Sequence, residues 1–135
     1  MSYPDKRLIR MIFDEYDFGN DANEVFSFRL PYDEHGVAQK GRLVNVGVMV
    51  TEVFACDSTV ASVRVGTAGN NDAFAELNIP DATADEDCYD VSDDTDAILD
   101  EDIPADTLVE VNLIQSTDAS SDTGKGIPFI DIYVW

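Results

Sequence analysis

Few side chains in this 135-residue sequence are suited to catalysis. A nucleophilic site of the Ser-His-Asp or Cys-His kind needs a histidine as its base, and His35 is the only histidine. It stands between Glu34 and Gly36, in a stretch whose composition is typical of a surface turn. Paired carboxylates such as Asp93 and Asp94 act as acid and base only in a cleft, whereas clustered surface acids are usually solvated. We therefore expect no catalytic residues and no enzymatic activity.

Calcium binding is the other chemical use of these acids, because carboxylate oxygens are its preferred ligands. The stretch from Asp90 to Glu101 ends on glutamate as an EF-hand loop does, but Thr95 stands at the sixth position, where such a loop needs glycine. One histidine and two separated cysteines, Cys56 and Cys88, do not complete a structural zinc site. We expect no specific metal site and no cofactor, and the sequence leaves diffuse cation binding by the acids as an alternative.

Charge limits the partners of the folded protein. The sequence holds 28 acidic residues against 8 Lys and Arg, which gives a formal net charge of -20. Such a surface repels phosphate backbones and anionic membranes, and no stretch approaches the roughly 20 apolar residues that cross a bilayer. We expect no nucleic-acid partner and no membrane partner. The N-terminal pattern differs from a secretory signal, so reduced thiols are expected at Cys56 and Cys88.

The elements that would carry these side chains are strands, since apolar and polar residues alternate through most of the chain. Alternation predicts strands at 25–30, 42–51, 60–65, 73–79, 107–114 and 128–135, with a shorter one at 88–91. Helical candidates are limited to turns near 71–76 and 95–102. The pattern predicts an all-β protein with a two-sheet antiparallel β-sandwich of the jelly-roll type. An immunoglobulin-like sandwich is less favoured because the single Trp is residue 135.

The last predicted strand, 128–135, sets aromatic side chains on one face, namely Phe129, Tyr133 and Trp135, with Asp131 between them. Aromatic residues concentrate in protein interfaces. Either another element of the monomer covers this face or the face is exposed as an interface. These three residues are therefore candidate interface aromatics.

Two segments differ from the rest of the chain. Residues 1–23 lack clear strand alternation and are interpreted as an extended N-terminal arm, in which Leu8, Ile9, Ile12 and Phe13 could form one helical stripe. Residues 24–135 are interpreted as the sandwich domain. Within it, residues 81–106 hold twelve acids and no Lys or Arg, so this segment is expected on the solvent side.

Residues 63–75 (VRVGTAGNNDAFA) and 103–111 (IPADTLVEV), together with the last strand, resemble small jelly-roll proteins of tailed-bacteriophage heads. These are capsid decoration (cement) proteins and head-fibre bases. The resemblance covers roughly residues 42–135. It implies a virion protein on the outer capsid surface, present in the host cytoplasm during assembly. Such a protein would bind the major capsid protein, reinforce contacts between capsid subunits and form a homotrimer.

In that setting the arm would dock on the capsid, through basic and apolar side chains: Lys6, Arg7, Leu8, Ile9, Arg10, Ile12 and Phe13. The acidic segment would face outward and keep particles apart. Another interpretation of the arm is that it packs on its own sandwich.

A carbohydrate- or receptor-binding sandwich of a phage fibre or tail is the alternative function. Tyr32, Tyr89 and the C-terminal aromatics could stack on sugar rings, with acids holding calcium.

Overall fold

The computed structural model describes residues 7–19, 23–56, 59–81, 83–84, 87–116 and 123–135, and these residues form strands and connecting loops but no helix. The strands are β1 (Arg7–Ile12), β2 (Tyr16–Asp17), β3 (Glu24–Arg29), β4 (Gly41–Ala55), β5 (Ala61–Thr67), β6 (Asn70–Ile79), β7 (Cys88–Asp90), β8 (Asp102–Ile103), β9 (Leu108–Ile114) and β10 (Thr123–Val134). All seven strands that alternation predicts are present, with shifted ends.

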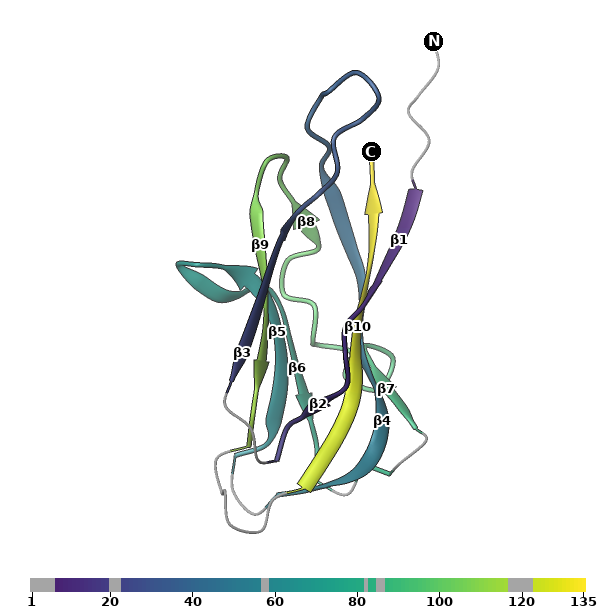
Figure 1. The fold of residues 1–135 in the computed structure, drawn as a ribbon, viewed down its shortest axis with the longest axis vertical. Helices are drawn as coiled ribbons and strands as arrows, with labels where there is room; N and C mark the ends of the chain where they lie inside the picture. Colours follow the sequence, from purple (N-terminus) through teal and green to yellow (C-terminus); the bar gives the residue numbers. More distant parts are fainter. Residues whose placement is uncertain (1–6, 20–22, 57–58, 82, 85–86, 117–122) are drawn as a thin grey trace.

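The strands build two antiparallel sheets that pack together, which confirms the predicted all-β, two-sheet antiparallel sandwich (Figure 1). The first sheet has the order β1-β10-β4-β7, with β2 also pairing with β10 and β8 with β4. The second has the order β3-β9-β5-β6.

The strand pairs are nested along the chain. Strand β5 pairs with β6, β4 with β7 and β8, β3 with β9, and β1 with β10. Successive pairs alternate between the two sheets. As a result, the first described strand lies beside the last.

The core lies between the sheets and follows the alternation of the strands. Val46, Val48 and Val50 on β4 are buried, as are the inward residues of β5, β9 and β10. A register shift lies opposite Asp131 and Ile132, so that Leu43, and not Val44, joins the buried set. Burying each such side chain contributes roughly 1.5–3 kcal/mol. The fully buried side chains include Phe18, Leu43, Leu77, Ile79, Ile103, Leu113, Ile130 and Ile132.

The described part of segment 1–23 packs on its own sandwich, which was the second interpretation of this segment, and does not form an extended arm. Strand β1 pairs with β10 along its whole length, so the helical stripe considered for this segment is absent. Tyr16 and Phe18 then enter the core, and Phe18 is completely buried. Residues 8–12 carry apolar side chains on both faces of the strand, which is why period-two alternation is not visible there.

The acidic segment 81–106 is also tied to the sandwich in its described residues. It supplies β7 and β8, which pair with β4, and it buries Ala97 and Ile103. The helical turns expected near 71–76 and 95–102 are absent: the first lies in β6, and the second is formed by turns and a loop.

Gly47 tests the packing between β4 and β10. A Cβ atom on Gly47 would lie 2.4 Å from Cζ of Phe129 and 2.9 Å from Cβ of Asp90. We expect Gly47→Ala to lower the free energy of unfolding in urea by about 1–3 kcal/mol. Gly69→Ala is the control, since no atom lies within 4 Å of its Cβ position, and it should change stability by less than about 0.5 kcal/mol. Equal losses in the two variants would contradict this packing.

Candidate docking surface

The outer face of the six-stranded sheet brings together two groups of residues that the sequence analysis considered separately. The register between β1 and β10 places Leu8 opposite Tyr133, Arg10 opposite Asp131, and Ile12 opposite Phe129. Three large apolar side chains remain accessible there, with exposed fractions of 55% for Leu8, 65% for Ile12 and 37% for Tyr133. We call this the β1–β10 face.

Arg10 and Asp131 form a two-pronged ion pair at its centre. Arg10 donates from Nε to Oδ1 at 2.7 Å and from Nη2 to Oδ2 at 2.8 Å. The N–H of Phe13 bonds the carbonyl of Pro128, so residues at odd positions of β1 form the hydrogen-bonded pairs with β10. Arg10 and Asp131 are therefore a non-hydrogen-bonded pair, whose side chains stand closer together.

The ion pair is unequally exposed. The side chain of Asp131 is 7% exposed and that of Arg10 is 55% exposed. Hydrogen bonding and charge attraction from Asp131 raise the pKa of the Arg10 guanidinium above its ordinary value. The guanidinium also lies 4.8 Å from the centroid of the Phe129 ring. Arg10 thus covers a buried carboxylate and a buried aromatic ring while it faces solvent itself.

The three candidate interface aromatics have different environments. Tyr133 is exposed, but Phe129 is only 4% exposed, which removes it from the accessible surface. Trp135 is half-buried, and its ring centroid lies 5.7 Å from Nζ of Lys40 and 5.9 Å from the guanidinium carbon of Arg42. These two cations were not singled out by the sequence, because nothing local links residues 40–42 to residue 135.

The residues proposed for the docking arm also lie in different environments. Leu8, Arg10 and Ile12 belong to the β1–β10 face, whereas Ile9 and Phe13 are partly buried against the core. Arg7 is exposed and donates to Gln39 at 3.2 Å. Lys6 lies outside the described residues.

His35 has no nucleophile to activate in its turn. Its side chain is 78% exposed, and its nearest charged neighbour is Glu34 at 3.5 Å. The carboxylate of Asp33 accepts the backbone N–H groups of Val37 at 2.9 Å and His35 at 2.8 Å, and these bonds hold the pKa of Asp33 below its ordinary value. These contacts shape a turn between β3 and β4.

Neither cysteine forms a disulfide bond: Cys88 is the first residue of β7, whereas Cys56 directly follows the end of β4. Burial, followed by repulsion from Asp90 and Asp93, raises the pKa of the Cys88 thiol above its ordinary value. This shift disfavours the nucleophilic thiolate. The thiol of Cys56 donates to the carbonyl of Thr59 at 3.1 Å.

Asp90, the last residue of β7, is held by hydrogen bonds from three neighbouring groups. Asp90 accepts the hydroxyl of Ser92 at 2.6 Å, the N–H of Ser92 at 2.9 Å and the amide of Asn45 at 3.3 Å. Burial would raise the pKa of Asp90, but these hydrogen bonds lower it overall. The described residues contain no group of three or more His, Cys, Asp or Glu side chains able to hold a metal ion.

Comparison with known proteins finds no matching family model, no matching curated protein and no matching solved structure. In the described part of the chain, no helix combines the length and the apolar character needed to cross a membrane.

The coupling between Arg10 and Asp131 can be measured with a double-mutant cycle. We expect Arg10→Met to destabilise the protein in urea, because it leaves a buried carboxylate without its partner. Asp131→Asn in the same background should recover part of the loss, since a neutral amide is less costly to bury. Additive effects of the two substitutions would show that the pair contributes no coupling energy.

Proposed function

We propose that this chain is a non-catalytic docking protein that binds the outer surface of a viral capsid through the β1–β10 face. The observation that carries the proposal is the composition of this face. It combines exposed Leu8, Ile12 and Tyr133 with the cation of Arg10 on a molecule whose net charge is -20. Exposed aromatic and arginine side chains are typical anchors of protein interfaces.

The fold supports the same proposal. The nested strand pairs, alternating between the sheets, are the arrangement expected for a jelly roll, and we infer that this sandwich is one. Jelly rolls occur in viral capsid domains. In this role the chain would be a decoration protein that binds the major capsid protein and reinforces contacts between capsid subunits.

Charge favours one orientation of the bound protein. Arg7 is carried by β1, and Lys40 lies beside Trp135 near the end of β10. Arg42 also lies beside Trp135, but its charge is met by Glu101 at 3.8 Å and Asp102 at 4.0 Å. Acids dominate the segment that supplies β7 and β8 at the other edge of the same sheet. A capsid surface with acidic patches would be attracted to the first region and repelled by the second.

Tyr133→Ala tests the docking face. We expect co-sedimentation with purified particles or expanded empty heads for the unmodified chain. The variant should bind at least about tenfold more weakly, as expected for loss of an aromatic anchor. Tyr32→Ala, which removes an exposed tyrosine from the β3–β4 loop, is the matched control and should bind normally. Absence of the unmodified chain from particles would refute the proposal.

Deletion of residues 1–20 is not a suitable test of docking. It removes β1 and β2 together with the buried Tyr16 and Phe18, so it would unfold the sandwich. Point substitutions on the outer face avoid this.

A second candidate function, carbohydrate or receptor binding on a fibre or tail, is favoured by one cleft. This cleft has a volume of about 330 Å³ and is lined by Arg7, Tyr32, Asp33, Glu34 and Gln39. Tyr32 is 54% exposed. An exposed ring among polar groups suits a sugar. Tyr89 does not share this environment, because it packs against the core.

A glycan array, read with and without a chelator, tests this second function. If it is correct, the unmodified chain binds at least one glycan and Tyr32→Ala loses that binding, whereas Tyr133→Ala retains it. No binding in either condition, or equal binding by the Tyr32 variant, would eliminate the sugar-binding role of this cleft.

A further inference from the structure

The two edges of the sandwich differ in how the space between the sheets is covered. At the edge formed by β6 and β7, the segment that connects β7 to β8 in the first sheet also bonds to β6 of the second sheet. The backbone N–H of Glu76 donates to the carbonyl of Ala97 at 2.8 Å, and the backbone N–H of Leu99 donates to the carbonyl of Phe74 at 2.9 Å. Ala97 is 1% exposed there. Backbone hydrogen bonds therefore close this edge, although the Leu99 side chain remains exposed.

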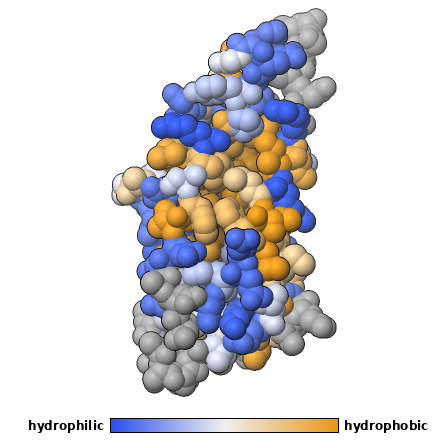
Figure 2. Space-filling model, in the orientation of Figure 1, coloured by the Kyte–Doolittle hydropathy of each residue, from blue (hydrophilic) through white to orange (hydrophobic). Residues whose placement is uncertain are grey.

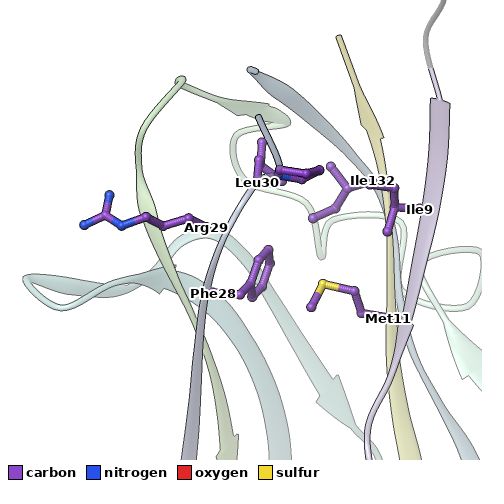
Figure 3. Close-up of a pocket in the computed structure, with 7 residues that line it drawn as sticks. Ile9, Met11, Phe28, Arg29, Leu30 and Ile132 are labelled. Atoms are coloured by element: carbon purple, nitrogen blue, oxygen red, sulfur yellow. The ribbon is translucent and has the colours of Figure 1, made fainter. Parts of the chain in front are cut away.

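The opposite edge, formed by β1 and β3, is open. Phe28 and Met11 point toward one another across a gap of about 210 Å³, with Ile9, Leu30 and Ile132 around it (Figure 3). Phe26 occupies the same face of β3 as Phe28, yet it remains 37% exposed. Figure 2 shows apolar surface across the middle of the molecule in this view, with hydrophilic surface above and below.

Strand β1 also has unused backbone groups along this edge. Its odd-numbered residues bond β10, as the contact from Phe13 to Pro128 shows, so the N–H and C=O groups of Leu8, Arg10 and Ile12 point away from β10. No other strand in the described part of the chain pairs with β1. Such an edge is a template for another strand.

The charges along β1 fit an antiparallel copy of the same strand. The segment begins with Arg7 and ends, just after the strand, with the exposed acids Asp14 and Glu15. Two copies in opposite directions would place the basic start of one beside the acidic end of the other. Between these ends, the side chains that line the gap are apolar.

We propose that the open edge is a two-fold interface in which β1 pairs antiparallel with β1 of a second copy of this chain. Only the even-numbered residues of β1 have outward backbone groups, so they must lie opposite even-numbered residues of the second copy. This requires the two-fold axis to pass through a residue of β1 and not between two residues. An axis at Arg10 would oppose two arginines, which is unfavourable. An axis at Met11 instead sets Arg10 opposite Ile12 of the second copy, so that the two Arg10 side chains do not face each other.

The interface continues the six-stranded sheet across two copies and covers the gap on both. A two-fold contact closes at two copies, so it gives a dimer in place of the trimer that the phage resemblance implies. It leaves the β1–β10 face accessible and is independent of the capsid proposal. A dimer presents two such faces, which would strengthen attachment to a repetitive surface.

Ionic strength gives the dimer a distinctive signature. Each copy carries a net charge of -20, so the two bodies repel one another while the apolar contact attracts them. Salt screens the repulsion over a Debye length of about 8 Å at physiological strength. The dimer should therefore strengthen as salt is raised.

Sedimentation of the purified chain tests whether a second copy of the chain binds the open edge. We expect a monomer–dimer equilibrium that shifts toward dimer between about 50 mM and 500 mM salt. Ile12→Pro removes an outward N–H without touching the bonds to β10, and proline is tolerated at such edge positions. Two bonds are lost per dimer, so Ile12→Pro should dimerise roughly tenfold more weakly than the control Ile12→Ala. A monomer under all conditions, or equal association of the two variants, would overturn the proposal.

Cysteine crosslinking tests the register, with Cys56→Ser and Cys88→Ser as background. With the axis at Met11, the two Met11 Cα atoms would lie about 4.5 Å apart, within the range of a disulfide. Met11→Cys should form a crosslinked dimer under mild oxidation, whereas Ile9→Cys should not, because its two copies are separated along the strands. Crosslinking through Ile9→Cys alone would overturn this register. Thermal unfolding of the reduced variants confirms that each remains folded.

Discussion

The pairing of β10 with β1 on one side and β4 on the other is the contact on which the rest of the structure depends. Alternation along β10 buries Ile130 and Ile132 between the sheets and turns Asp131 and Tyr133 to the outer face. A carboxylate on a side chain that is only 7% exposed requires a partner, and the close pairing with β1 supplies Arg10. The same register therefore completes the sheet, compensates a buried charge and composes the β1–β10 face.

Period-two alternation was sufficient to predict the sandwich, because most strands are buried on one face only. It failed at β1, where Leu8 and Ile12 are apolar on the outer face while Ile9 and Met11 line the inner gap. The two-residue strands β2 and β8 are too short to show any period. In the acidic segment, the composition predicted a solvent-exposed loop and gave no indication that Ala97 and Ile103 are buried.

The candidate site was predictable only in pieces. The sequence suggested basic and apolar residues near the N-terminus and aromatic residues at 129–135, but it could not show that they are cross-strand partners, since register is not encoded in either segment. One local signal does indicate the contact: an acid at Asp131, inside an otherwise apolar and aromatic strand, calls for a partner when it is buried. The burial of Phe129 is equally hidden in the sequence, because the ring is covered by Arg10, which lies in a distant part of the chain.

The nesting of the strands has a consequence for biosynthesis. Arg7 pairs with Val134, so β1 leaves the ribosome long before its partner exists. At typical translation rates the interval between the end of β1 and the start of β10 is roughly 5–20 s. During this time Leu8, Ile9 and Ile12 lack the sheet that organises them, and non-local pairing of this kind folds slowly. We expect the nascent chain to depend on chaperones that shield extended apolar segments, and its acidic residues to limit aggregation while it waits.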